Sequence, residues 1–295
     1  MKEKIIIFGT GDGGKSYHNN NDSYETIAFC DNDEKKQGEL FNDIKIISPN
    51  DIKNINYDYI VIASMYVTEI KEQLITELGI ESNKIIIPNK KLLKRTFQPF
   101  QDKETLNFAR KTLIELAELF EEKKINYFIN FGVLLGLIRD GDILPWDDDI
   151  DLAVYEEDKN VLIEVLKEHF LIVNRTSSIK WNCFLYEANK KYPINLYLIF
   201  NNCSINNFPI GIDFLALDFK TFINRNGNMK YPRKFFEDIN YINFKEKKIR
   251  VPNNPEEYLK LLYGDWQTPK KDISFEEYSF TSSGFSNNYT KTKIF

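Results

Sequence analysis

Cysteine and histidine are both scarce in this chain of 295 residues, which has three cysteines and two histidines. Cys30, Cys183 and Cys203 lie far apart, so they match neither the spacing of a zinc site nor an even-numbered disulfide framework. His18 and His169 have no Ser or Asp motif around them, so catalysis based on histidine is not expected. These features predict a protein of a reducing compartment, the cytoplasm.

Long apolar runs and an excess of positive charge are also missing. No window approaches the ~18 apolar residues of a membrane span, and the N-terminal apolar run is too short for a signal peptide. A net charge of −5 and a pI near 5.4 argue against nucleic acid as a partner. The hydrophobic content of 42% and charged content of 28% are those of a globular protein, and the length suffices for two domains.

A glycine-rich loop follows the first apolar run, at residues 4–8. Gly9, Gly11 and Gly14 satisfy the G-x-G-x-x-G pattern, and Asp31 ends the next apolar run about twenty residues later. In a dinucleotide-binding βαβ unit, such glycines let the backbone approach a phosphate and such an acid holds a ribose. The spacing predicts a nucleotide-binding site of this kind.

Further strands are predicted at 57–64 and 84–88, with a helix at 67–79 between them, so a small Rossmann-like parallel sheet is expected over residues 1–90. Through GTGDGG, FCDND and PNDI, this region resembles the N-terminal nucleotide-sugar-binding domain of PglD-like acyltransferases. Two roles stay open, ligand binding and a scaffold for homo-oligomerisation. Hydride transfer is not expected, because no residue for it is visible.

Residues 91–104 form a basic, proline-interrupted linker. Two interpretations stay open for it. One is a peripheral contact with membrane-bound glycan machinery at the inner face of the membrane, which its cations would favour. The other is an ordinary solvated hinge.

A second domain is predicted over residues 105–295. It begins with an amphipathic helix at 105–122 and a strand at 125–132, and a short helix led by Gly132 then precedes an acidic strand. The N-terminus of a glycine-led helix binds phosphate through its free backbone N–H groups. This order is typical of the nucleotidyltransferase core.

The acidic strand contains Asp147, Asp148, Asp149 and Asp151 and continues as an apolar alternation. In an extended strand Asp149 and Asp151 share one face, where they repel each other unless a cation lies between them. Hard oxygen ligands suit Mg²⁺ or Mn²⁺. A solvated acidic turn or a helix cap would not explain the alternation. An EF-hand loop would need Gly and Glu where Leu152 and Asp158 stand.

Four segments resemble the LicD family of phosphotransferases, whose relatives include fukutin and the fukutin-related protein. The segments are FGVLLGLIRDGDILPWDDDIDLAV at 131–154, IDFLALD at 212–218, YPRKFF at 231–236 and VPNNPEEYLKLLYGDW at 251–266. The resemblance implies a nucleotidyltransferase-like domain with a mixed sheet. It also implies transfer of a phospho-alcohol, such as phosphocholine or ribitol phosphate, from a CDP-linked donor to a sugar hydroxyl, with release of CMP.

The resemblance also implies roles for individual acids. Asp149 and Asp151 would be metal ligands, and Asp147 would support them through water. Asp213 would complete the metal site or act as general base toward the acceptor hydroxyl. Because a cation lowers the pKa of a neighbouring carboxylate, such a base would act mainly through positioning.

Donor phosphate binding is expected at Gly132, Val133 and Arg139. Arg139 would neutralise diphosphate charge, and the alternative is a cation that stabilises a helix C-terminus. Val133 departs from the family, which has Ser or Thr there, and the change removes one hydrogen bond of about 1 kcal/mol.

These features predict an α/β and α+β protein, and the resemblance implies that it decorates a bacterial surface polysaccharide. Two alternatives are a nucleotidyltransferase that releases pyrophosphate and a noncatalytic nucleotide- or glycan-binding protein. The aromatic residues of the 155–210 region would either surround a quaternary ammonium group through cation–π contacts or pack as ordinary strand residues. They are Trp181, Phe184, Tyr186, Tyr192 and Tyr197.

Overall fold

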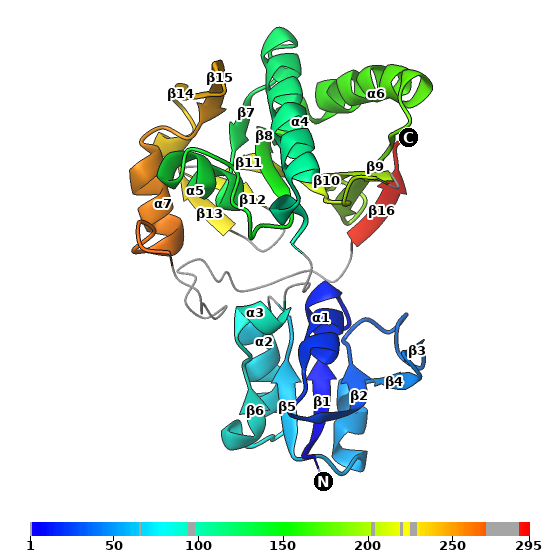
Figure 1. Cartoon of the computed structure of the whole chain (residues 1–295). Coiled ribbons are helices and arrows are strands. Elements are labelled where there is room, and N and C mark those ends of the chain that lie inside the picture. The colour runs from blue at the N-terminus through cyan, green and yellow to red at the C-terminus, as the bar shows by residue number, and fades with distance from the viewer. Residues whose placement is uncertain are drawn as a thin grey trace. The chain divides into compact units, whose positions relative to one another are not determined.

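The computed structural model of the chain consists of two compact units (Figure 1), built mainly from residues 1–97 and from residues 98–267 with the C-terminal strand. The structure describes residues 2–64, 66–93, 98–201, 204–218, 221–224, 229–269 and 289–295. Among these residues, no helix has both the length and the apolar composition needed to cross a membrane.

The first unit is a parallel sheet with helices, as predicted. Its elements are β1 (Lys4–Phe8), α1 (Asp12–Asn20), β2 (Glu25–Cys30), β3 (Leu40–Phe41), β4 (Ile44–Ile47), η1 (Pro49–Asn54), β5 (Tyr59–Ile62), α2 (Val67–Glu72), η2 (Gln73–Glu77), η3 (Ser82–Lys84), β6 (Ile85–Ile86) and α3 (Lys90–Leu93). The strand order is β3-β4-β2-β1-β5-β6, and every pairing except β3–β4 is parallel. The central β1 is buried on both faces, which explains its continuous apolar run.

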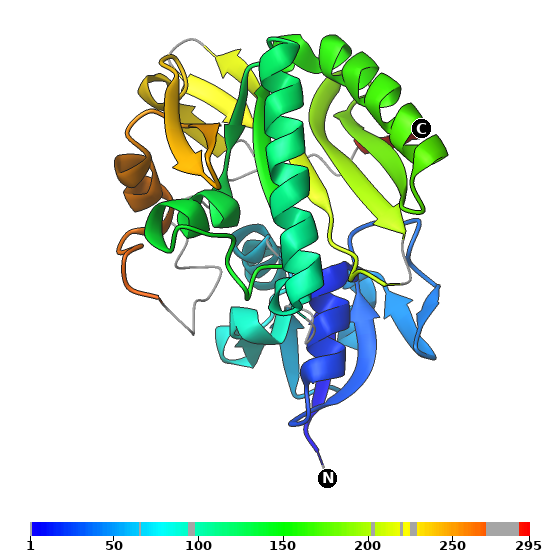
Figure 2. The same ribbon diagram turned by 45° about the horizontal axis from the view of Figure 1, so that its top comes forward.

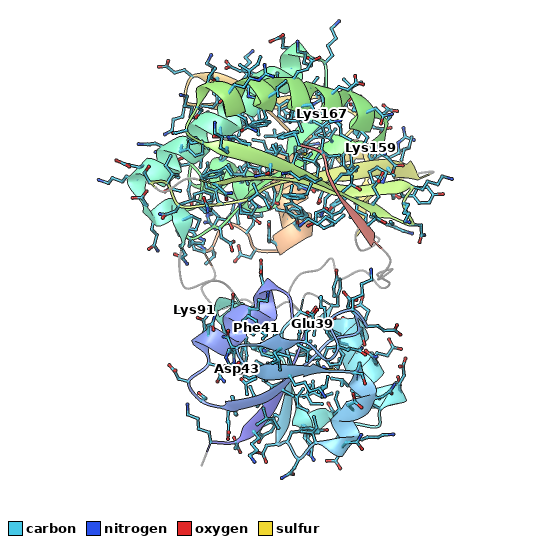
Figure 3. All side chains as sticks on the ribbon, turned by 90° about the vertical axis from the view of Figure 1, so that its right-hand side faces the viewer. Glu39, Phe41, Asp43, Lys91, Lys159 and Lys167 are labelled. Carbon is cyan, nitrogen blue, oxygen red and sulfur yellow. The ribbon has the colours of Figure 1, made fainter. Side chains whose placement is uncertain are left out.

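The β3–β4 hairpin is a feature that the sequence analysis did not predict. Its two turn residues, Asn42 and Asp43, have φ values of 49° and 63°. This backbone is that of a type I′ turn, which favours Asn and Asp and matches the twist of the paired strands. Figure 3 labels Glu39, Phe41 and Asp43 of this hairpin, and the Phe41 ring packs edge-on against Phe29 at 5.3 Å between centroids.

The second unit combines one large sheet with four helices in its described part. Its elements are η4 (Pro99–Gln101), α4 (Lys103–Glu122), β7 (Tyr127–Ile129), α5 (Phe131–Arg139), β8 (Ile150–Tyr155), η5 (Glu156–Asp158), α6 (Lys159–Thr176), β9 (Lys180–Ala188), β10 (Tyr192–Asn201), β11 (Ile210–Asp218), β12 (Thr221–Asn224), β13 (Met229–Pro232), η6 (Arg233–Phe235), β14 (Asn240–Phe244), β15 (Lys247–Val251), α7 (Pro255–Tyr263) and β16 (Tyr289–Lys293).

The large sheet is mixed, which confirms the predicted fold class. Strands β7, β8, β11, β10, β9 and β16 lie side by side in that order, and β12 and β13 extend the sheet from β11. The β8–β11 pairing is parallel, whereas the other pairings are antiparallel. The acidic strand β8 therefore lies inside the sheet, between β7 and β11.

One face of this sheet is covered by α4 and α6 (Figures 1 and 2). Phe108 of α4 stacks on Trp181 of β9, and Phe170 of α6 packs against the same indole at 5.0 Å between centroids. Figure 3 labels Lys159 and Lys167 on α6, and Lys159 forms a 3.0 Å ion pair with Glu187 of β9. Alternate residues of the strands therefore form a core under the helices, and the remaining residues point to the opposite face.

Candidate active site

Strand β8 carries the predicted carboxylates on the face opposite α4 and α6. Ile150 and Leu152 are buried toward the helices, whereas Asp151 points the other way and is mostly but not fully buried. Asp149 directly precedes the strand. Carboxylate oxygens of Asp147, Asp148 and Asp149 lie within 4.8 Å of one another, which is close enough to share one cation.

Asp213 reaches the same face from β11. The parallel register pairs Gly211 with Asp151 and Asp213 with Ala153, so the two carboxylates are diagonal neighbours. Gly211 makes this arrangement possible, because a Cβ there would lie 3.2 Å from Asp151 Oδ1 and 3.4 Å from the Tyr197 ring. The structure thus places Asp151 and Asp213 on one face of the sheet, within the electrostatic reach of Asp149 and Asp147. The described carboxylates close enough to share one cation are those of Asp147, Asp148 and Asp149, and Asp148 was not among the predicted ligands.

The close approach of these acids affects the ionisation of Asp151. Burial raises the pKa of Asp151 well above its ordinary value, and the charges of Asp149 and then Asp213 raise it further. Tyr197, on the neighbouring β10, also has a raised pKa because of burial and then the charge of Asp213. The site therefore has an excess of negative charge that a cation would relieve.

Asp147 lies against the first turn of α5. A Cβ on Gly132 would be 2.0 Å from Asp147 Oδ2, so only glycine allows the carboxylate to lie there. Asp147 is 8% exposed. An anion is favourable at a helix N-terminus. The Asp147 carboxylate therefore already lies beside this turn, and donor phosphate binding at Gly132 stays a prediction.

The start of α5 has a strained backbone. Phe131 has a φ of 44°, a conformation that costs a non-glycine residue about 1–2 kcal/mol. Asn130 holds it in place: its side-chain Oδ1 accepts from Phe131 N at 3.0 Å and from the Tyr258 hydroxyl at 2.8 Å. Asn130 N in turn donates to Asp151 O, which ties the turn to β8.

Two buried asparagines are site residues that the sequence analysis missed. Asn130 is fully buried and Asn195 is 5% exposed. Within the described part of the chain, Asn130 Nδ2 and Asn195 Oδ1 have no hydrogen-bond partner. Asn195 on β10 pairs directly with Asp213, so its side chain lies on the same face as the carboxylates. A polar residue before the apolar run of α5 was the available signal for Asn130, as a helix cap.

The loop between α5 and β8 is anchored to α4. Arg110 of α4 binds the Asp142 carboxylate through two contacts, Nε to Oδ1 at 2.8 Å and Nη2 to Oδ2 at 2.5 Å. A bidentate contact of this type fixes both partners in orientation. The contact therefore fixes the beginning of the loop that leads to Asp147.

Arg139 and Val133 occupy different positions on α5. Arg139 is at the other end of α5, about 12 Å along its axis from Phe131. Its guanidinium binds Asp140 through two 2.9 Å contacts and lies 5.8 Å from the centroid of the Trp146 ring. Val133 is fully buried in the core. A side-chain role in phosphate binding stays a prediction for Arg139.

In the first unit, Asp31 holds the glycine loop through hydrogen bonds. Asp31 accepts hydrogen bonds from Thr10 N at 3.0 Å, from the Thr10 hydroxyl and from Asp33 N at 2.9 Å. Burial favours a higher pKa for Asp31, but these bonds and Lys36 together lower it. Asp31 therefore holds the loop, and ribose binding by it stays a prediction.

Of the three predicted loop glycines, Gly9 and Gly14 are required by the local structure, whereas Gly11 is not. Gly9 has a φ of 107°, and a Cβ on Gly14 would lie 1.9 Å from Gly9 O, so close packing of α1 against β1 requires both. Gly11 caps α1, and nothing lies within 4 Å of a Cβ built there.

Comparison with known proteins matches two family models. Residues 1–86 match the C2185-like N-terminal domain, and residues 124–254 match the LicD/FKTN/FKRP nucleotidyltransferase domain. The first match corrects the prediction of a PglD-like domain, since the matching model is that of C2185-like proteins. The second match confirms the predicted LicD resemblance.

Two curated proteins are similar to this chain in sequence. An uncharacterised protein of Rickettsia prowazekii is 28% identical over 60% of this chain and 61% of its own length. The human ribitol 5-phosphate transferase FKRP is 24% identical over 54% of this chain and 32% of its own length. The chain thus spans less than two thirds of either relative.

Among solved structures, the lincosamide adenylyltransferase LnuA bound to lincomycin is similar with a TM-score of 0.34 and 18% identity. The similarity covers 50% of this chain and 83% of that chain. The matched domain model and the sequence similarity to FKRP both support the assignment of residues 124–254, in the second unit, to the LicD/FKTN/FKRP nucleotidyltransferase domain.

Proposed function

We propose that this protein is a metal-dependent transferase that moves a phospho-alcohol from a CDP-linked donor to a sugar hydroxyl of a bacterial surface glycan, releasing CMP. The observation that carries the proposal is the meeting of the acids of β8 and β11 on one sheet face, beside the first turn of α5. FKRP, a similar protein, is named as a ribitol 5-phosphate transferase, which supports a phospho-alcohol as the transferred group.

The donor atoms of the site fit Mg²⁺ or Mn²⁺. They are carboxylate oxygens, which these hard cations prefer, and those of Asp147, Asp148 and Asp149 lie within 4.8 Å of one another. Asp147, Asp149 and Asp151 would hold the ion, and Asp213 would complete the set. When bound, the ion would neutralise charge on the donor diphosphate.

The chain's own residues would orient the reacting groups. The acceptor oxygen forms a bond to the phosphorus that bears the alcohol, and the bond from that phosphorus to the CMP oxygen breaks. Asp213 would take the proton of the acceptor hydroxyl. Tyr231 and Tyr258 would keep their protons beside it, because burial raises the pKa of both well above the ordinary value.

This chemistry depends mainly on positioning and charge neutralisation, as other phosphoryl transfers do. The strained turn at Phe131 supports the proposal, since strain of this type is found at functional sites.

The test is a panel of CDP-choline, CDP-ribitol and CDP-glycerol, each with Mg²⁺ and a capsule-type oligosaccharide as acceptor. The expected product is CMP, with a loss of at least a hundredfold in rate for Asp149→Ala and Asp151→Ala. Glu164→Gln on the far face, an exposed carboxylate of α6, is the matched control and should keep the wild-type rate. Transfer of CMP to the acceptor with release of the phospho-alcohol, pyrophosphate release from CTP in a parallel reaction, or wild-type rates in the aspartate variants would overturn the proposal.

A further inference from the structure

Two straight rows of residues cross the large sheet on the face opposite α4 and α6, from the carboxylates to the edge strand β16. Because directly paired residues share a face, the strand registers define both rows. One row is Ala153, Asp213, Asn195, Tyr186 and Lys291, and the other is Asp151, Gly211, Tyr197, Phe184 and Lys293. Each row begins at an acid-bearing strand and ends at an exposed lysine.

The middle of these rows offers both polar and aromatic contacts. Asn195 Oδ1 is buried without a hydrogen-bond partner in the described part of the chain, which is costly unless a ligand supplies a donor such as a hydroxyl. The rings of Phe184, Tyr186 and Tyr197 are partly exposed beside it. Tyr186 and Tyr197 meet edge to face at 5.7 Å between centroids. Rings with neighbouring hydrogen-bonding groups suit a sugar, which has apolar C–H faces and hydroxyl edges.

The far end of the rows is cationic. Lys291 Nζ lies 4.2 Å from the centroid of the Phe184 ring and 5.6 Å from that of Tyr186. The chain's own ammonium group therefore already uses these rings for a cation–π contact. A quaternary ammonium group is disfavoured there by like-charge repulsion, whereas an anionic group would be attracted to Lys291 and Lys293.

The in-line geometry of phosphoryl transfer favours an acceptor site on the β11 side of the carboxylates. The attacking and leaving oxygens lie on opposite sides of the phosphorus in an in-line transfer. If CMP leaves on the α5 side of β8, the acceptor hydroxyl approaches from β11, where Asp213 lies, and the rest of the acceptor extends over β10, β9 and β16. Three strand spacings separate Asp213 from Lys291, which is about 14 Å and long enough for a short oligosaccharide.

We propose that Asn195, Tyr197, Tyr186 and Phe184, with Lys291 and Lys293 at the edge, form an acceptor subsite for a glycan that carries an anionic group, a carboxylate or a phosphate. The sugar next to the reacting hydroxyl donates a hydrogen bond to Asn195 and packs on the rings. The anionic group binds the two lysines. The inference rests on the proposed function, since it assigns this face to the acceptor of that reaction.

Binding to the full chain tests the subsite without requiring turnover. The probes are tetragalacturonate, maltotetraose 6-phosphate and neutral maltotetraose, measured by calorimetry at low salt. The expected result is at least tenfold tighter binding of one or both anionic probes than of maltotetraose. The arm that binds identifies whether the anion is a carboxylate or a phosphate. Equal affinity for all three probes, or no binding of any, would overturn the inference.

Variants locate the effect. Changing both Lys291 and Lys293 to Met should abolish the preference for anionic probes, whereas changing both to Arg should keep it. Tyr186→Ala should weaken binding of all the probes. Lys167→Met removes an exposed lysine from α6, on the opposite face, and should leave every affinity unchanged (Figure 3). An unchanged preference in the double Met variant would overturn the inference.

A separate activity measurement distinguishes this failure from failure of the proposed function. Mg²⁺-dependent release of CMP with water as acceptor requires the carboxylates but not the subsite. CMP release without any preference for anionic glycans would refute the subsite alone. A preference for anionic glycans without CMP release would refute the proposed function and leave the subsite in place.

Discussion

Replacing Asp151 by Asn should stabilise the metal-free protein while removing its response to Mg²⁺. Asp149 is about 7 Å away along the chain, and Asp213 is a diagonal neighbour at about 7–8 Å. At an effective dielectric constant of about 20, each ionised neighbour opposes the ionisation of Asp151 by about 2 kcal/mol. The neutral amide removes this repulsion, so we expect Asp151→Asn to increase the free energy of unfolding by about 2–4 kcal/mol at pH 8 without metal.

The dependence on pH has a defined sign. Burial, and then the charges of Asp149 and Asp213, raise the pKa of Asp151 in the folded protein above its unfolded value of about 3.9. The folded state thus binds the proton more tightly than the unfolded state. The contribution of Asp151 to the free energy of unfolding is fully present at pH values below its unfolded pKa. It is lost as the pH rises toward its raised pKa in the folded protein. Asp151→Asn should lack this loss.

The assay is urea unfolding at pH 5 and pH 8, with and without 10 mM MgCl₂. Mg²⁺ should stabilise the wild type, most strongly at pH 8 because metal ligands must be deprotonated, and should not stabilise Asp151→Asn. Glu164→Gln removes an exposed carboxylate of α6 and should behave as the wild type. Equal stability of the wild type and Asp151→Asn without metal, or an equal Mg²⁺ response, would refute the electrostatic account of this site.

Three further predictions concern single contacts. Gly132→Ala should cost about 1–3 kcal/mol, since its Cβ would lie 2.0 Å from Asp147 Oδ2; addition of Asp147→Ala should restore stability, and simple additivity in this double-mutant cycle would contradict the clash. Val133→Thr should destabilise by about 1–3 kcal/mol, because it buries a hydroxyl in a fully buried position; a decrease in the KM for the donor would instead show that the hydroxyl reaches a phosphate. Asp31→Ala should lower the melting temperature of the first unit, since Thr10 loses its acceptor, at a cost of about 1–3 kcal/mol. Because folding lowers the pKa of Asp31, the destabilisation by Asp31→Ala should shrink as the pH falls through that pKa. A destabilisation that does not change with pH would contradict the role of the ionised Asp31 in holding the loop.

Local patterns in the sequence predicted the features that depend on nearby residues. The apolar run before the glycine loop predicted β1, and the alternation after Asp149 predicted the buried face of β8. These predictions succeed because the period of side-chain burial is set within a single strand or helix. The β3–β4 hairpin was missed, although Asn42 and Asp43 are typical residues of its turn.

The sequence by itself determined that the chain carries a LicD-type domain and an acidic strand with its carboxylates on one face. Only the tertiary structure decided which distant residues join them. Asn195 and Lys291 are in line with Asp213 because of the register of β11, β10, β9 and β16. A shift of one residue in any pairing would turn these side chains to the other face, and register depends on packing across the whole sheet rather than on neighbours along the chain.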